Sequence, residues 1–125
     1  MNFWKHAVLI VVLVSPVAAV ASESECRAIA LREYPDDASM QKFVYNQQLS
    51  AYRYMLTVTD AEVKAFAERE YSNDYAMQKF VYDKQVADKR YMSAMPETAA
   101  KAAARREYPY DYSMQKFVYD RSVTR

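Results

Sequence analysis

The sequence of 125 residues contains no glycine, one cysteine and one histidine. Without glycine, the chain cannot build the turns that cradle phosphates or dinucleotides, because those turns need positive φ angles and a close backbone approach. The only histidine, His6, lies in an N-terminal segment that we expect to be removed, so no imidazole base or ordinary mixed zinc site remains. A single cysteine forms neither an internal disulfide nor a cysteine-based metal site. We therefore expect no metal and no cofactor, and only carboxylates, lysine, serine and tyrosine remain for catalysis.

The N-terminus has the pattern of a cleavable export signal. A basic residue, Lys5, precedes an apolar run over 7–14, and Ala19 and Ala21 are small residues at the two positions that a signal peptidase reads. A retained membrane anchor is the alternative, but the apolar segment contains a proline and is shorter than the roughly 20 residues that span a bilayer. The pattern therefore predicts a signal peptide over 1–21.

The remaining chain, 22–125, is expected to be exported and to be periplasmic or secreted. Once Lys5 is removed with the signal, 16 basic residues balance 16 acidic residues. A neutral domain lacks the cationic excess that binding to a phosphate backbone requires, and this one has no basic amphipathic segment for an anionic membrane. We therefore expect neither a nucleic-acid partner nor a stable membrane anchor after cleavage.

A block of six residues, Met-Gln-Lys-Phe-Val-Tyr, occurs three times without change, starting at positions 40, 77 and 114. The starts are 37 residues apart, which indicates that one unit has been copied whole. We define unit 1 as 26–62, unit 2 as 63–99 and the truncated unit 3 as 100–125. The lack of glycine and the few prolines favour helices with short connections. The expected fold is all-α, with three tandem αα-hairpins stacked as a short helical array.

Each unit is expected to contain a first helix, A, and a second helix, B. Paired hydroxyl and carboxylate residues, Ser22 with Glu25 and Thr59 with Glu62, predict the start of helix A in units 1 and 2, and Pro96 predicts it in unit 3. Helix A is expected to stop at a tyrosine that proline or serine follows. The aspartates expected to cap helix B are Asp37, Asp74 and Asp111. Helix B is predicted to reach about Leu56 and Met95 in the full units and the end of the chain in unit 3.

The block residues fall into two groups. Met40, Phe43 and Val44, with their copies, lie on one face of helix B and are expected to pack in the core. The other three project from other sides, and two explanations remain open. In the structural one, Gln and Tyr bridge to helix A near Arg32–Tyr34 and the lysines form i,i+4 pairs with aspartate in units 2 and 3. In the functional one, they form a regular partner-binding surface: Gln41, Lys42, Tyr45, Gln78, Lys79, Tyr82, Gln115, Lys116 and Tyr119.

One weak catalytic motif is present, since Ser39 and Ser113 each precede a lysine in the Ser-x-x-Lys pattern of penicillin-recognising serine enzymes. Unit 2 has Ala76 at the serine position, and the partner Lys-Thr-Gly motif needs a glycine. We therefore expect no enzymatic activity. Cys26 is either a packed thiol or the site of a disulfide between two chains, and its repeat equivalents, Val63 and Ala100, favour the packed thiol.

The segment from Tyr34 to Gln48 resembles uncharacterised small bacterial exported proteins that carry an aromatic-Pro-x-Asp-x-x-Met-Gln motif. The resemblance implies no activity. The sequence favours a non-catalytic exported protein that binds a protein or peptide of the cell envelope, for instance as an inhibitor or immunity factor. A structural envelope protein that self-associates through the end of the array near 112–125 is the alternative, and a serine/lysine hydrolase is the third hypothesis.

Overall fold

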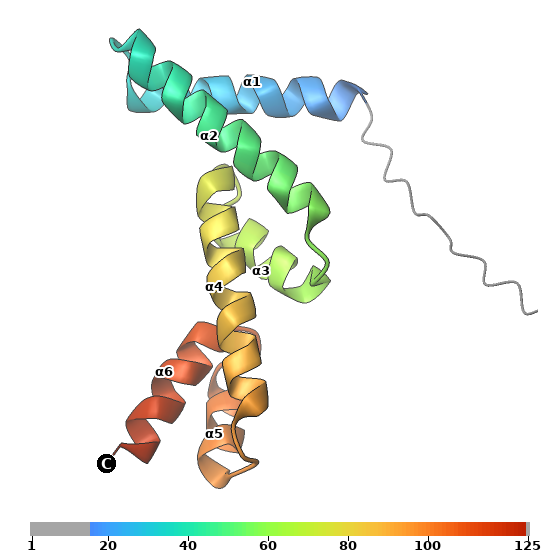
Figure 1. Cartoon of the computed structure of the whole chain (residues 1–125), viewed down its shortest axis with the longest axis vertical. Coiled ribbons are helices and arrows are strands. Elements are labelled where there is room, and N and C mark those ends of the chain that lie inside the picture. The colour runs from blue at the N-terminus through green and yellow to red at the C-terminus, as the bar shows by residue number, and fades with distance from the viewer. Residues whose placement is uncertain (1–15, 125) are drawn as a thin grey trace, which may run out of the picture.

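The computed structural model describes residues 16–124, which form six α-helices and, within that range, no strand (Figure 1). The helices are α1 (Pro16–Glu33), α2 (Ala38–Thr57), α3 (Ala61–Glu70), α4 (Tyr75–Ala94), α5 (Ala99–Glu107) and α6 (Tyr112–Val123). The predicted all-α fold is confirmed. α1, α3 and α5 correspond to helix A of each unit, and α2, α4 and α6 correspond to helix B.

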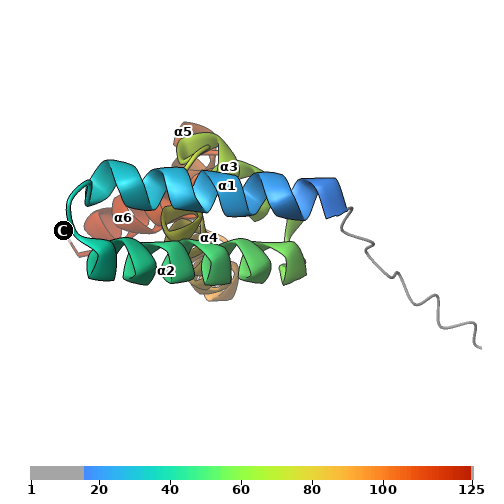
Figure 2. The same ribbon diagram turned by 90° about the horizontal axis from the view of Figure 1, so that it is seen from above.

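The B helices follow one another along an elongated array (Figure 1). α2 contacts α4 and α4 contacts α6, while each A helix packs on the B helix of its own unit. The α1–α2 pair lies at one end of the array and the α5–α6 pair at the other. Figure 2 looks along the array and shows α1 and α2 running antiparallel, side by side. Each hairpin thus meets its neighbour mainly through helix B.

The ends of the helices follow local signals. Each helix B is capped by the expected aspartate, whose carboxylate accepts a hydrogen bond from the backbone N–H three residues on at 3.0 to 3.1 Å: Asp37, Asp74 and Asp111. Helix A ends at Glu33, Glu70 and Glu107, one residue before each tyrosine. No described residue has a positive φ angle. The chain therefore changes direction without the conformations that favour glycine.

The starts of helix A differ from the sequence prediction in all three units. α1 begins at Pro16, so Ser22 lies inside this helix and does not cap it. The cap of α3 is Asp60 rather than Thr59, and the cap of α5 is Thr98 rather than Pro96. In α3 a tertiary contact favours the aspartate, because Asp60 also accepts a hydrogen bond from Lys89 of α4 at 2.8 Å. Local pairing rules cannot include that contact.

The predicted signal peptide is only partly in view, because residues 1–15 lie outside the described range. The predicted cleavage point after Ala21 falls within α1. None of the helices in residues 16–124 is long and apolar enough to cross a membrane.

The core consists of small clusters, and two of them span neighbouring units. Met55 near the end of α2 packs against Val63, Ala67 and Tyr82 of unit 2. Met92, 37 residues further on, packs in the same way against unit 3. Each unit is therefore stacked on the next by a methionine that fills the space between the next A and B helices.

Candidate partner-binding surface

The glutamine of the block closes the end of helix A. In each unit its Nε2 donates to the backbone oxygen of the tyrosine seven residues earlier at 2.7 Å, from Gln41, Gln78 and Gln115. The last carbonyls of a helix lack partners within the helix, so this bond satisfies one of them. Gln78 and Gln115 are only 3% and 2% exposed, whereas Gln41 is half-buried. The structural explanation accounts for these glutamines, and the two buried ones are not accessible to a partner.

The tyrosine of the block is also enclosed in units 2 and 3. Tyr82 and Tyr119 are buried, whereas Tyr45 is half-buried. The hydroxyl of Tyr82 accepts a hydrogen bond from the backbone N–H of Asp60 at 3.1 Å. It therefore bridges to the start of helix A, the end opposite to the one that the sequence predicts.

The lysine of the block joins two units. Lys79 Nζ donates to Asp83 at 2.7 Å, which is the predicted i,i+4 pair, and lies 4.4 Å from the ring centre of Tyr54 on α2. The Tyr54 hydroxyl donates to the same carboxylate. This bond raises the pKa of Tyr54 to about 12, because the carboxylate stabilises the protonated phenol. The same arrangement recurs 37 residues on, between Lys116, Asp120 and Tyr91.

A second contact between units was not expected from the sequence. Gln48 in the middle of α2 donates to the cap residue Asp74 at 2.8 Å and accepts from the backbone N–H of Ala76 at 3.2 Å. Gln85 makes the corresponding bonds to the start of α6. An alignment of the second halves of the units could have found these residues, because Gln48, Tyr54 and Met55 recur 37 positions later as Gln85, Tyr91 and Met92.

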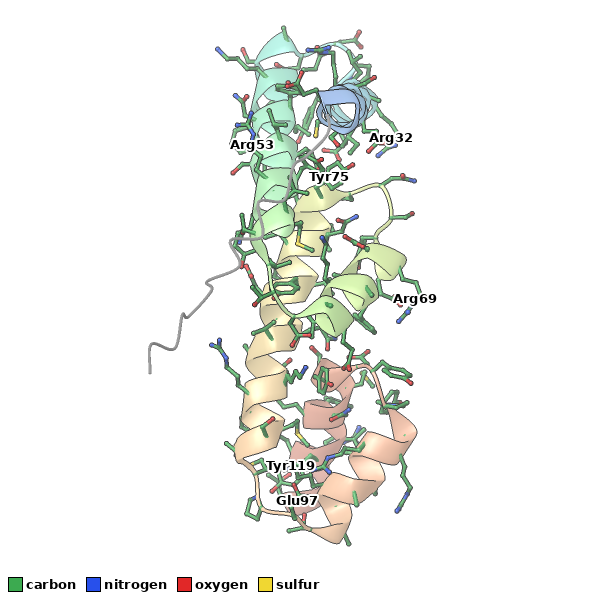
Figure 3. The ribbon with its side chains drawn as sticks, turned by 90° about the vertical axis from the view of Figure 1, so that its right-hand side faces the viewer. Arg32, Arg53, Arg69, Tyr75, Glu97 and Tyr119 are labelled. Atoms are coloured by element: carbon green, nitrogen blue, oxygen red, sulfur yellow. The ribbon has the colours of Figure 1, made fainter. Side chains whose placement is uncertain are left out.

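Tyrosines at the start of helix B reach back to the preceding helix A. Tyr75 donates to Glu25 of α1, and Tyr112 donates to Glu62 of α3. Figure 3 shows Tyr75 at the end of α4 that lies beside α1. Unit 1 has Ala38 at this position, so it carries no side chain of this kind.

The phenylalanine of the block is exposed, and the prediction that it packs in the core is wrong. The exposed fractions of Phe43, Phe80 and Phe117 are 59%, 61% and 51%. Phe43 lies about 200° around the helix from both Gln41 and Tyr45, whose copies in units 2 and 3 are buried. Val44 is buried as predicted, and Met40 is half-buried. We call the three exposed residues the phenylalanine series.

Charged groups surround the last member of this series. The Arg121 guanidinium lies 5.4 Å from the ring centre of Phe117. Two shallow hollows of about 310 and 260 Å³ border this ring, and residues such as Lys116 and Asp120 line the larger one. An apolar ring with a charged surround is a common arrangement at protein interfaces.

In unit 1, the three residues predicted as a binding surface lie together. Gln41, Lys42 and Tyr45 line a groove of about 290 Å³ whose other wall is formed by Arg27 and Leu31 of α1. We call this the end groove. Lys42 is exposed, and Asn46 rather than an aspartate stands four residues on. The structure therefore brings the predicted residues to the surface together in unit 1, whereas in units 2 and 3 contacts within the array enclose them.

Nothing in residues 16–124 forms a cluster of histidine, cysteine, aspartate and glutamate that could hold a metal ion. Ser113 Oγ accepts from Lys84 at 3.3 Å, while the lysine of its Ser-x-x-Lys motif pairs with Asp120. Cys26 is a free, fully buried thiol, as the packed interpretation expects, and burial raises the pKa of this thiol.

Comparisons with protein-family models, curated proteins and solved structures find no match to this chain.

Proposed function

We propose that this protein is a non-catalytic, exported helical-repeat scaffold that binds a protein partner in the cell envelope. The observation that carries the proposal is the phenylalanine series. Burial of an exposed phenylalanine stabilises a complex by about 1.5–3 kcal/mol, so three such rings offer a substantial driving force for association. Inhibitors and immunity factors are proteins that work by such binding.

The other residues of the block make contacts within the array, and the phenylalanines differ from them in this respect. Glutamine closes helix A, lysine and tyrosine join units, and valine packs in the interior. Phenylalanine takes part in none of these contacts, yet it stands at the same position in every unit. A regular array presents such residues at regular intervals, which suits an extended partner surface.

The test compares three versions of the protein, each expressed with its N-terminal segment and purified from the cell compartment in which it accumulates. Removal of the predicted signal peptide leaves Ser22 as the expected N-terminus. The first is the native protein, and the second carries Phe43→Ser, Phe80→Ser and Phe117→Ser. The third is a matched control with Tyr110→Ser and Val123→Ser, which removes exposed apolar surface elsewhere. Circular dichroism is expected to show equal helicity, because exposed substitutions change the free energy of unfolding by only about 0.5 kcal/mol.

Each protein is then used to capture partners from envelope extract, with identification by mass spectrometry. The native protein and the control are expected to enrich the same partner, and the phenylalanine variant is expected to lose it. Equal capture by all three proteins would contradict the proposal. A mass that rises with concentration, with or without reductant, would instead favour the self-associating structural protein.

A further inference from the structure

The end groove of unit 1 has a covered counterpart in unit 3. Four of its six lining positions, advanced by two repeats, line a cleft of about 360 Å³ between α4 and unit 3: Lys101, Arg105, Tyr112 and Gln115. In that cleft, Met92 and Lys89 of α4 help to form the opposite wall. The surface that is bare in unit 1 is therefore covered in unit 3 by helix B of the preceding unit.

The interfaces between units 1 and 2 and between units 2 and 3 show which side chains helix B contributes to the next unit. A tyrosine places its ring over the block lysine and donates to the residue four positions after that lysine. A glutamine six residues before the tyrosine binds the cap aspartate of the next helix B. The methionine directly after the tyrosine packs into the core of the next unit. α2 and α4 share this Gln-x5-Tyr-Met pattern.

Unit 1 keeps the polar groups that receive such a helix, whereas Cys26 and Ala30, at the positions of Val63 and Ala67, are already buried and leave no place for its methionine. The side chain of Asp37 is exposed, and its Oδ1 accepts only the capping bond from Met40. Lys42 makes no ion pair or ring contact with the described residues, so its ammonium is free to contact an aromatic ring. Asn46 stands where units 2 and 3 have aspartate, and its amide oxygen can still accept a hydrogen bond from a phenol.

Unit 1 also lacks the tyrosine that binds a second helix in units 2 and 3. In units 2 and 3 a tyrosine at the start of helix B donates to a glutamate on the preceding helix A. Ala38 replaces that tyrosine in unit 1, so a single helix can satisfy the surface.

A second copy of this chain, stacked end to end, does not bring the same groups. At the exposed end of unit 3, Ser122 stands at the position of Gln48 and Gln85, so the glutamine that binds the cap aspartate is missing. The glutamine that would bind Asp37 is therefore absent from that end of the array, which favours a different protein as the occupant.

We propose that the end groove, with Asp37 and Asn46 at its border, is a docking site for one helix of another protein that carries the pattern Gln-x5-Tyr. The tyrosine ring lies over Lys42, its hydroxyl donates to Asn46, and the glutamine amide donates to Asp37. This site is separate from the phenylalanine series and does not depend on the function proposed for it.

The test uses a probe that the chain itself supplies, a fluorescent peptide of residues 84–95. A hydrocarbon staple between the exposed positions 87 and 94 holds it helical, because a free peptide of this length is marginally helical in water. Fluorescence anisotropy measures its affinity for the native protein, for Lys42→Glu and for the charge-matched control Arg53→Glu, which lies outside the end groove. Both substitutions change exposed residues on the same helix, so the fold is expected to be retained.

We expect saturable binding to the native protein and to Arg53→Glu, and at least about a tenfold weaker affinity for Lys42→Glu. Replacing the tyrosine of the peptide by alanine is expected to weaken binding to the native protein similarly. Absence of saturable binding, or equal affinity for Lys42→Glu, would overturn the proposal. A dimer of the native protein that the peptide dissociates would also overturn it, because the occupant would then be a second copy.

Discussion

At the scale of the residue, identical residues of the repeats are expected to contribute differently to stability because their surroundings differ. Gln78 donates to a backbone carbonyl in a buried site, while Gln41 makes the same bond in a half-buried site. The distance to the tyrosine oxygen is 2.7 Å in both places, but the burial differs, and Gln41 also donates to the oxygen of Pro35 at 3.2 Å. The cost of losing the bond therefore depends on what would replace it.

Replacing Gln78 by alanine is expected to lower the free energy of unfolding by about 1–3 kcal/mol, since the Tyr71 carbonyl then keeps only the longer bond of 3.4 Å from the Asp74 N–H and buried polar surface loses a partner. Gln41→Ala is expected to cost clearly less, because water can reach the Tyr34 carbonyl. Urea titration followed by circular dichroism measures both variants. Equal losses would show that burial of this bond does not determine its contribution.

At the scale of the element, the start of helix B in units 2 and 3 is stabilised both by its own cap and by a contact from the preceding unit. The carboxylate of Asp74 caps α4 and also accepts from Gln48 of the preceding unit. The carboxylate of Asp37 caps α2 and has no such neighbour among the described residues. The same sequence signal thus makes a local contact in unit 1 and a local and tertiary contact in unit 2.

Loss of the cap alone costs about 0.5–2 kcal/mol, which is the expected destabilisation for Asp37→Ala. Asp74→Ala is expected to cost more, because it also leaves the buried Gln48 amide without its acceptor. Asp74→Asn keeps an acceptor oxygen and is expected to recover most of the stability. The midpoints of urea unfolding distinguish these variants, and an Asp37→Ala loss as large as that of Asp74→Ala would refute the second contact.

At the scale of the whole molecule, tyrosine–carboxylate bonds connect successive units. They run from Tyr54 and Tyr91 to the aspartate of the next helix B, and from Tyr75 and Tyr112 to the glutamate of the preceding helix A. Hydrogen bonding to aspartate raises the pKa of Tyr54 and Tyr91, and burial followed by bonding to glutamate raises the pKa of Tyr75 and Tyr112. These four connections between units therefore all require protonated phenols.

This requirement predicts that the array is sensitive to alkali. The folded state holds these protons more tightly than the unfolded chain, whose tyrosines titrate near pH 10. The stabilisation is complete below about pH 10 and is lost as the pH rises towards the raised pKa of about 12 for Tyr54. The urea midpoint is expected to be nearly constant from pH 8 to 9 and to fall steeply above pH 10.

The variant Tyr54→Phe with Tyr91→Phe removes two of these titrations, so its midpoint is expected to fall less steeply above pH 10. Tyr110→Phe, which changes an exposed side chain, is the control and is expected to follow the native protein. Identical slopes for all three proteins would show that these bonds do not couple stability to pH.

The sequence by itself determined the features that depend on neighbours along the chain. The period of 37 residues, the all-α fold, the aspartate caps of helix B and the lysine–aspartate pairs of units 2 and 3 were all predictable. Each rests on backbone hydrogen bonding or on side chains three or four residues apart, which operate within one helix.

Only the tertiary structure decided which face of helix B is covered. Hydrophobicity favoured the face of Phe43, but the interior instead takes Gln78 and Tyr82, because the adjoining helices supply partners for their polar atoms. A buried polar group is acceptable only when such a partner is in place, and for Gln78 and Tyr82 the partner lies outside helix B. The same dependence leaves the block lysine covered in unit 2 and free at the end groove in unit 1.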